Sequence, residues 1–433
     1  MRKLGLIGVL ILAFSTLTVP SASALTSGNC TVNLSSSTGV VLINNGGFCY
    51  LAFSATGANS FTVPTGVTSS AVLVVAGGGA GGAGAWGGGG GAGGVLYGAS
   101  YPLTPGTTMN LSVGAGGLSG SATLTPSTNR SNNGGDSWIN TSSTFVAKGG
   151  GAGASFAWGS ATASDANGSA GGSGGGGTEY GGGGAGGAST QTLPTHGTTI
   201  YGNTGGLTPA INYTSGGGGG GAGAAGTPVT AAGTGAAGGA GTSAFSSWFS
   251  AIGQFGVGGF IAGGGGGGSS TTRGAAGSGG GGIGADQSNT TAGNGVANTG
   301  SGGGGASYVS SALPAGNGGS GLIIFKFAEN ILPANINAPT VASVVSKGIT
   351  TTITVTMDSP GRVQFFWGNK TIGGCVSVVT TGSSPTYTAT CNWRPTVTGT
   401  TLVKATLRPT NSSQAAVTSS SKFVVINKRT TRR

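Results

Sequence analysis

The stretch AVLVVAGGGAGGAGAWGGGGGAGG, residues 71–94, decides the fold, because an apolar β-branched run passes directly into glycine. Residues 72–75 are typical of a buried strand. At the far end of the glycine region, Gly321 is followed by LIIFKF, residues 322–327, which predicts a matching strand. A free linker has no reason to begin and end in core strands, so this pair predicts a folded glycine-rich region.

Glycine is concentrated between these two strands. The chain has 433 residues and 99 glycines, of which eight precede Gly77 and seven follow Gly321, so 84 lie between. Collagen has a similar proportion, but runs such as residues 263–268 lack its strict three-residue period. Charged residues make up only 5% of the chain, against roughly 25% in ordinary globular proteins. The composition excludes collagen and argues against an ordinary enzyme.

A polyglycine region can be compact only if backbone packs against backbone. An extended helix with three residues per turn projects its amide and carbonyl groups sideways, so neighbouring helices can hydrogen-bond to one another. Only glycine fits where backbones approach so closely. We therefore expect a mainly β and irregular fold, in which strands bracket a lattice of polyglycine II-like helices.

The composition changes after Ala328, where ILPANINAPT, residues 331–340, is typical of a linker. Short alternating patterns then recur about every ten residues, which predicts a C-terminal β-sandwich. The expected strands are residues 350–356, 362–367, 386–391, 402–407 and 422–426.

The N-terminus has the features of a secretory signal. Arg2 and Lys3 precede the apolar run LGLIGVLILAF, and small residues follow at 21–24. We expect cleavage after Ala24 and a secreted or cell-surface protein, without a membrane span because no later apolar run approaches 18 residues. The expected organisation is a signal peptide at 1–24, an N-terminal β segment at 25–76, a glycine-rich domain at 77–327, a linker at 328–339, a β-sandwich at 340–427 and a basic tail at 428–433.

Four cysteines in an exported chain predict two disulfides, although the sequence permits three pairings. The simplest arrangement joins near neighbours, Cys30 with Cys49 and Cys375 with Cys391. Each bond would close a loop of about 15 to 20 residues, worth roughly 3 kcal/mol in the chain-entropy account.

Charge is divided unevenly along the chain, whose formal net charge is +11. Residues 77–321 carry three basic and four acidic side chains, whereas the chain from Leu322 onward carries twelve basic and two acidic ones. By its charge alone, the C-terminal part is therefore suited to binding an anionic wall polymer or a lipid headgroup. A solvated face that maintains solubility explains the same charges, and nucleic acid is not an expected partner.

Five motifs follow one another along this part of the chain: AVLVVAGGGAGG (71–82), LTPGTTMNLSVGAGG (103–117), NGGDSWI (133–139), VAKGGGAG (146–153) and GNGGSGLIIFKF (316–327). In this order they resemble the glycine-rich domain of bacterial surface proteins and phage tail-tip adhesins. The resemblance covers roughly residues 61–327 and implies stacked polyglycine helices whose connecting loops serve recognition. The signal peptide departs from the pattern of phage adhesins, which lack one.

A second resemblance concerns the C-terminal part. The segments GRVQFFWGNKTIGGC (361–375), TATCNW (388–393) and GTTLVKATLRP (399–409) are similar to Ig-like repeats of exported actinobacterial proteins, as is the basic ending KRTTRR. The resemblance implies an Ig-like β-sandwich.

Three short motifs match known site patterns without their context. Residues 79–84 fit a dinucleotide-binding fingerprint but no helix pattern follows, and residues 171–175 fit a nucleophile elbow without a preceding strand. Residues 281–286 match a single calcium-binding nonapeptide, where tandem copies are needed. With six acidic residues and one histidine, His196, we expect no catalytic residues, cofactor or metal.

Aromatic residues that interrupt the glycine pattern are the candidate binding loops: Phe156, Trp158, Tyr201, Tyr213, Phe245, Trp248, Phe249, Phe255 and Phe260. Flat rings stack on sugars or anchor protein partners, but they also suit an apolar cover for the lattice. We expect a non-enzymatic surface protein for adhesion or recognition of a cell-surface glycan or protein. The alternatives are a self-associating coat or matrix protein and a secreted hydrolase of unrecognised type.

Overall fold

The computed structural model describes residues 23–35, 38–120, 130–155, 166–179, 183–210, 214–308, 314–329, 334–383, 386–410 and 414–429. The chain forms two compact units, Met1–Asn330 and Ile331–Arg433, and the boundary falls inside the predicted linker. All but the last two residues of the predicted signal peptide, and the last four of the predicted basic tail, lie outside the described residues.

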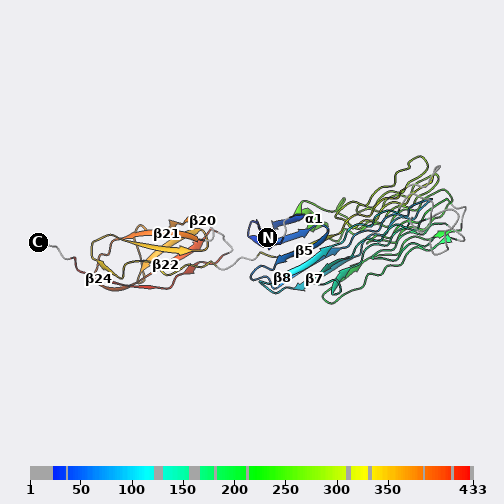
Figure 1. Cartoon of the computed structure of the whole chain (residues 1–433). Helices are drawn as coiled ribbons and strands as arrows, with labels where there is room; N and C mark the ends of the chain where they lie inside the picture. The colour runs from blue at the N-terminus through cyan, green and yellow to red at the C-terminus, as the bar shows by residue number, and fades with distance from the viewer. Residues whose placement is uncertain are drawn as a thin grey trace, which may run out of the picture. The chain divides into compact units, whose positions relative to one another are not determined.

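The described part of the first unit is built from short strands and the short helix α1 (Figure 1). Its elements are β1 (Ser23–Ser27), β2 (Cys30–Leu34), β3 (Val40–Asn45), β4 (Phe48–Phe53), β5 (Gly57–Thr62), β6 (Ser69–Val75), β7 (Val95–Pro102), β8 (Thr108–Val113), β9 (Ser137–Ile139), β10 (Phe145–Ala147), β11 (Gly183–Gly184), β12 (Thr199–Tyr201), β13 (Thr208–Pro209), α1 (Ser246–Ile252) and β14 (Leu322–Ala328).

Two six-stranded sheets enclose the main apolar core of this unit. Their strand orders are β1-β2-β5-β8-β9-β10 and β12-β7-β6-β14-β4-β3. Phe61 of β5 and Phe325 of β14 meet between the sheets with ring centroids 4.9 Å apart. Because β5 pairs with β8, and β4 with β14, the predicted N-terminal β segment and glycine-rich domain are parts of one compact unit.

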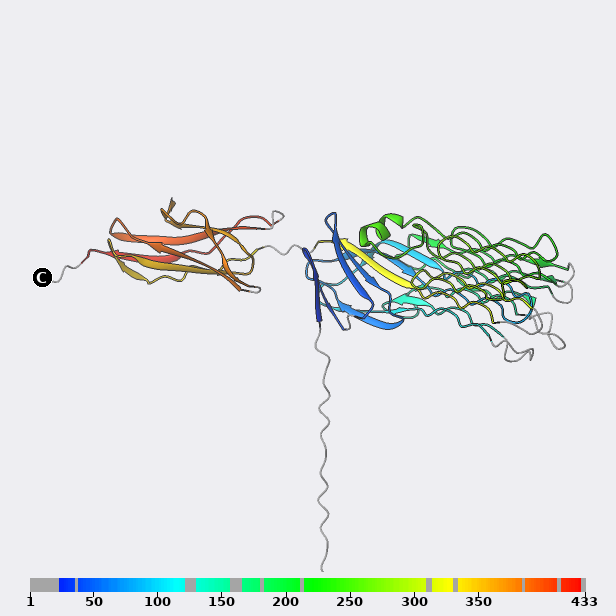
Figure 2. The same ribbon diagram turned by 90° about the horizontal axis from the view of Figure 1, so that it is seen from above.

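The two strands predicted to bracket the glycine region lie side by side. β14 pairs antiparallel with β6, so that Leu322 is opposite Val75 and Ile324 is opposite Leu73. Both strands are nearly continuous apolar runs because α1 covers the second face of their sheet (Figure 2). The glycine region therefore leaves and re-enters the sheet at adjacent strand ends.

Hydrogen bonds in the glycine runs repeat every three residues. In residues 87–94, three successive backbone amides donate hydrogen bonds to three different segments of the chain. The amide three residues further along then donates to the same segment again. The donor and acceptor pairs are Gly87 with Ala306, Gly90 with Gly303 and Gly93 with Gly300; Gly88 with Ala154, Gly91 with Gly151 and Gly94 with Lys148; and Gly89 with Gly217 and Ala92 with Gly220. Three residues per turn is the repeat of the polyproline II type of helix.

Most of these glycines are buried without belonging to a regular strand or helix, and their segments lie next to one another (Figures 1 and 2). Their polar backbone groups are satisfied by the lattice bonds. The predicted mainly β and irregular fold is confirmed. In the part of the chain that is described, no helix is long and apolar enough to span a membrane.

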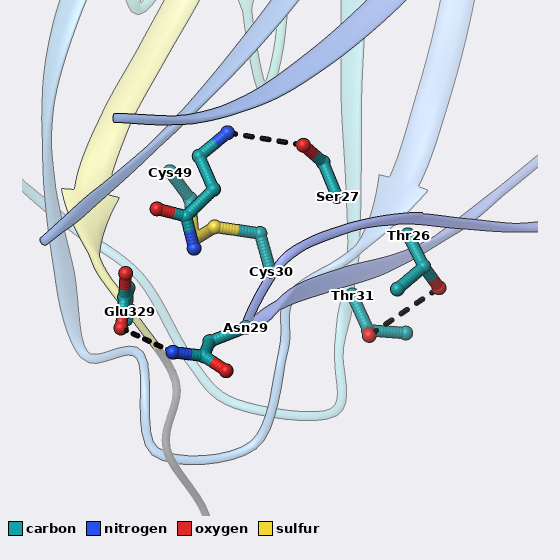
Figure 3. The surroundings of a disulfide bond; sticks show 8 residues. Thr26, Ser27, Asn29, Cys30, Thr31, Cys49 and Glu329 are labelled. Atoms are coloured by element: carbon teal, nitrogen blue, oxygen red, sulfur yellow. Dashed lines mark hydrogen bonds between the residues drawn. A yellow bond between two sulfur atoms is a disulfide. The ribbon is translucent and has the colours of Figure 1, made fainter. Parts of the chain in front are cut away.

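The predicted disulfide pairing within the first unit is present. Cys30 of β2 is bonded to Cys49 of β4, which ties together strands of the two different sheets (Figure 3). Beside it, the Asn29 side-chain amide donates to a Glu329 carboxylate oxygen at 2.9 Å, just beyond the end of β14 (Figure 3).

The second unit also consists of strands. They are β15 (Val344–Ser346), β16 (Thr351–Met357), β17 (Gly361–Trp367), β18 (Lys370–Thr371), β19 (Val378–Val379), β20 (Thr381–Ser383), β21 (Thr386–Trp393), β22 (Gly399–Pro409), β23 (Val417–Thr418) and β24 (Lys422–Asn427). The five predicted strands correspond to β16, β17, β21, β22 and β24.

A larger and a smaller sheet enclose the core of the second unit. The order β15-β24-β22-β17-β18 forms the larger sheet, with β19 beside β17 and β23 beside β22, and β16-β21-β20 forms the smaller one. The second predicted disulfide is present too: Cys391 of β21 is bonded to Cys375, whose carbonyl accepts the Phe365 amide of β17. This disulfide therefore links the two sheets.

Candidate functional site

Six of the nine aromatic residues predicted as binding candidates lie in the described part of the chain. They are Tyr201 at the end of β12, Phe245, Trp248 and Phe249 at α1, and Phe255 and Phe260 in the loop that follows. The other three, Phe156, Trp158 and Tyr213, lie outside the described residues.

The short helix α1 presents its aromatic residues to the protein interior. Phe245, Trp248, Phe249 and Ile252 are only 4%, 7%, 4% and 5% exposed, because their spacing places them on one helix face. Gly253 ends the helix with a left-handed φ of 73°, and its amide donates to the Phe249 carbonyl. The helical spacing of these apolar residues can be read in the sequence, but it covers only two turns and so is a weak signal for a helix.

Tyrosines from the sheet complete an aromatic cluster around α1. The ring centroid of Phe245 lies 5.4 Å from that of Tyr97 and 6.0 Å from that of Tyr201, and Trp248 lies 6.0 Å from Tyr50. Tyr50 and Tyr97 were not among the predicted site residues. The burial of the α1 aromatic residues favours their role as an apolar cover. Tyr201 and Phe255 are half-buried and pack against this cluster, and Phe260 is half-buried in the loop after α1.

A cation of the chain already occupies the edge of this cluster. The ammonium of Lys326 in β14 lies 4.4 Å from the ring centroid of Phe48, 5.3 Å from that of Tyr50 and 5.6 Å from that of Trp248. Such cation–π contacts are worth roughly 0.5–2 kcal/mol. The ring faces that point toward Lys326 are therefore not open to a cationic ligand.

A polar cavity of about 610 Å³ lies elsewhere on the first unit, where β7, β8, the β9–β10 turn and the loop before β12 meet. Its lining is Tyr101, Pro102, Thr104, Thr107, Thr108, Met109, Asn140, Ser143, Thr144, Phe145, Thr195 and His196. Long-range sheet pairing brings these residues together, so no local sequence pattern marks them.

Two aromatic rings and two unusual backbone conformations shape the cavity. The rings of Tyr101 and His196 meet edge to face, with centroids 5.9 Å apart. Asn140 and His196 have left-handed φ angles of 70° and 67°, which are uncommon for residues other than glycine. Residues held in such conformations are enriched at binding sites.

The described residues that line the cavity offer hydrogen-bond donors and acceptors but no negatively charged group. Burial raises the pKa of the Tyr101 hydroxyl, so the phenol stays protonated and can donate at neutral pH. The other polar groups of the lining are threonine and serine hydroxyls, the Asn140 amide and the His196 imidazole. Among the described residues of the lining there is no carboxylate that could orient His196 for acid–base chemistry. This arrangement suits a neutral, hydroxyl-rich ligand.

The three segments that match known site patterns belong to the glycine lattice. Residues 79–84 and 171–175 are extended segments with lattice hydrogen bonds and no following helix. In residues 281–286, the Asp286 carboxylate accepts the backbone amides of Ser288 and Asn289, at 2.9 and 2.6 Å, and so closes a turn. Among the described residues, no group of three or more His, Cys, Asp and Glu side chains is placed to hold a metal ion.

The aspartate is held in its charged form. Burial alone would raise the pKa of Asp286, but hydrogen bonds from the Asn289 amide and side chain, the Ser288 amide and the Arg273 amide lower it below its ordinary value. Asp286 is 4% exposed. Its carboxylate is therefore a structural group that fixes the turn after the glycine run.

Comparison with known families bears on the first unit. A family model described as a glycine-rich domain matches residues 54–328, more than half of the 433-residue chain. The match begins in the loop before β5 and ends with the last residue of β14. No curated protein matches the sequence closely enough to count as a relative.

Proposed function

The chain belongs to the glycine-rich domain family, and on that premise we propose that it is an exported, non-enzymatic surface protein for adhesion or recognition. The polar cavity around Tyr101 and His196 carries this proposal. The lattice uses its amides and carbonyls internally, so recognition is left to side chains at the margin of the unit. The partner is a cell-surface glycan, because the cavity matches a neutral polyhydroxylated ligand.

Export is supported by two independent features. The N-terminal sequence has the pattern of a secretory signal, and the two disulfides belong to proteins that fold in oxidising compartments. Within this proposal, the first unit acts like the recognition domains of bacterial surface proteins and phage tail-tip adhesins. The second unit acts as an Ig-like spacer or wall-binding module.

The test is retention of the purified mature chain, residues 25–433, on whole host cells and on isolated wall material. Thr195→Trp adds a large side chain at the cavity and should reduce retention about tenfold, the equivalent of roughly 1.4 kcal/mol. Thr230→Trp is the matched control, because Thr230 is exposed in the same unit but outside the cavity lining. The control should bind as the parent chain does.

Two results would make us abandon this function. One is retention of the parent chain no better than that of a sequence-scrambled control. The other is equal retention of the two tryptophan variants, which would remove the cavity from the binding surface. Light scattering over a concentration series addresses the coat or matrix alternative, because a persistent monomer contradicts self-association.

A further inference from the structure

Two arginines of the second unit lie directly opposite each other on neighbouring strands. Arg362 of β17 and Arg408 of β22 are register partners in the antiparallel ladder, and both side chains are exposed. Like charges in directly opposite positions destabilise a sheet, by an amount of roughly 0.2–1 kcal/mol. Unless a negative charge lies close to both guanidinium groups, their mutual repulsion reduces the stability of this sheet.

Both arginines line the same surface cavity, which has a volume of about 540 Å³. The other lining residues are Gln364, Val376, Ser377, Pro409 and Thr410. Arg362 Nη1 donates to the Ser377 hydroxyl at 3.3 Å, which holds one guanidinium at the wall of the cavity. The lining brings together two cations and two hydroxyl groups, and no carboxylate is among its described residues.

The second unit has almost no acidic side chains with which to neutralise the pair. From Ile331 onward the sequence contains eleven basic residues and one acidic residue, Asp358. The Asp358 carboxylate accepts the Asn335 amide at 2.8 Å and the Ser359 hydroxyl at 2.9 Å. These hydrogen bonds hold the Asp358 carboxylate in the turn before β17, and Asp358 is not part of the cavity lining.

We propose that the cavity between Arg362 and Arg408 binds a phosphate group of a phosphodiester polymer outside the cell. This inference rests on the proposed export of the chain. A guanidinium presents a planar fork that bonds two oxygens of an oxyanion at once. A phosphodiester and a carboxylate each have two charged oxygens, but the acceptor sites of a carboxylate lie in one plane and suit a single planar fork. The tetrahedral phosphate directs its acceptor sites out of one plane, so that a second arginine and the Ser377 and Thr410 hydroxyls can share the same two oxygens.

The experiment measures binding of fluorescent poly(glycerol phosphate) to the mature chain at equal ionic strength. Arg362→Ala with Arg408→Ala should weaken binding about tenfold or more, since two charge-assisted contacts are lost. The matched control is Lys347→Ala with Lys422→Ala. This control also removes two positive charges, but from exposed positions of the same unit outside the cavity lining. It should weaken binding about threefold or less.

A conservative pair separates the guanidinium fork from simple charge. Arg362→Lys with Arg408→Lys preserves the net charge but removes both planar forks, and it should lose most of the affinity that the alanine pair loses. Retention of the second unit's thermal transition in all three variants, followed by circular dichroism, shows that the comparison is between folded proteins.

Three outcomes would overturn the inference. Equal losses of affinity when the two arginines and when the two lysines are replaced by alanine would show that binding depends on net charge alone. Full affinity in the variant with Arg362→Lys and Arg408→Lys would show that the planar guanidinium groups are not needed. Equal affinity for polygalacturonate, a carboxylate polymer, would remove the preference for phosphate.

Failure of the proposed function gives a different pattern. A chain that binds poly(glycerol phosphate) through the arginine pair but is not retained on cells refutes the surface role and leaves the phosphate site standing. A chain retained on cells through the Thr195 cavity, with no affinity for the polymer, refutes only the phosphate site.

Discussion

The carbonyl oxygen of Gly79 lies only 2.2 Å from the position that a β-carbon on Gly90 would occupy. The same oxygen accepts the amide of Gly303 at 3.0 Å, and the Gly90 amide in turn donates to the Gly303 carbonyl at 2.8 Å. Three extended segments therefore meet with no space for a methyl group between them. Contact of backbone with backbone, and not chain flexibility, is what requires glycine here.

Substitution Gly90→Ala should therefore destabilise the first unit by roughly 3 kcal/mol, because a backbone segment must shift to relieve the overlap. Denaturant unfolding followed by circular dichroism measures this loss. Gly106→Ala is the control, since its β-carbon would meet nothing within 4 Å although φ is 79°. That variant should lose about 1 kcal/mol from the left-handed conformation alone. Equal losses in both variants would contradict the packing explanation.

Much of this arrangement could be predicted from the strands that flank the glycine region. The runs at 72–75 and 322–327 predicted two core strands, and β6 and β14 are present there. Apolar runs of this kind report burial on both faces of a sheet. Sequence cannot show that these strands are neighbours, because residues more than 240 positions apart are brought together only by the closed path of the lattice.

The candidate site was harder to predict for two physical reasons. The aromatic residues of α1 break the glycine pattern whether they bind a partner or cover the sheet, and only the fold shows that Trp248 packs on Tyr50. The polar cavity joins Tyr101 to Asn140 and His196, which are distant in sequence and individually ordinary. Asn and His adopt left-handed conformations more often than other non-glycine residues, but this preference is too weak to mark these two positions in the sequence.

The first disulfide should be a measurable source of stability. Replacing both Cys30 and Cys49 by serine opens a bond between residues 19 positions apart and should lower the free energy of unfolding by roughly 3 kcal/mol. Differential scanning calorimetry of the mature chain measures the effect. The paired substitution of Cys375 and Cys391, 16 positions apart, provides the comparison, because that bond lies within the second unit. A shift of the same calorimetric transition by both pairs would contradict assignment of each bond to its own unit.

The turn at Asp286 should make part of the first unit's stability dependent on acid. The pKa of Asp286 is lower in the folded chain than its ordinary value of 3.8, so its charged form favours folding. This contribution is complete above the unfolded pKa and is lost as pH falls through the lower, folded pKa. Asp286→Asn should lose about 1–2 kcal/mol at neutral pH and show a flatter pH dependence below about pH 4.

Unfolding measured between about pH 2 and pH 7 tests this prediction. The control is Asp136→Asn, because Asp136 forms a salt bridge with Lys148 in which both side chains are about 40% exposed. Exposed ion pairs contribute little, roughly 0–1 kcal/mol. An acid limb unchanged in the Asp286 variant would contradict the hydrogen-bond account of the lowered pKa.

The buried tryptophan of α1 distinguishes a cover for the lattice from a binding loop. Trp248 is 7% exposed and packs against Tyr50, Tyr97 and Phe245. Trp248→Ala should therefore destabilise the first unit by roughly 3–5 kcal/mol, as truncation of a buried aromatic side chain does. Phe260→Ala, at a half-buried position of the following loop, should lose less.

Chemical denaturation and cell retention must be measured on the same samples, because each explanation predicts a different pair of results. If Trp248 serves as a cover, the Trp248→Ala variant loses stability, and the fraction that remains folded binds cells as the parent chain does. If Trp248 belongs to a binding loop, retention falls while the free energy of unfolding changes by less than about 1 kcal/mol. The first pattern is expected, since a ring enclosed by three aromatic neighbours has little surface left to offer a partner.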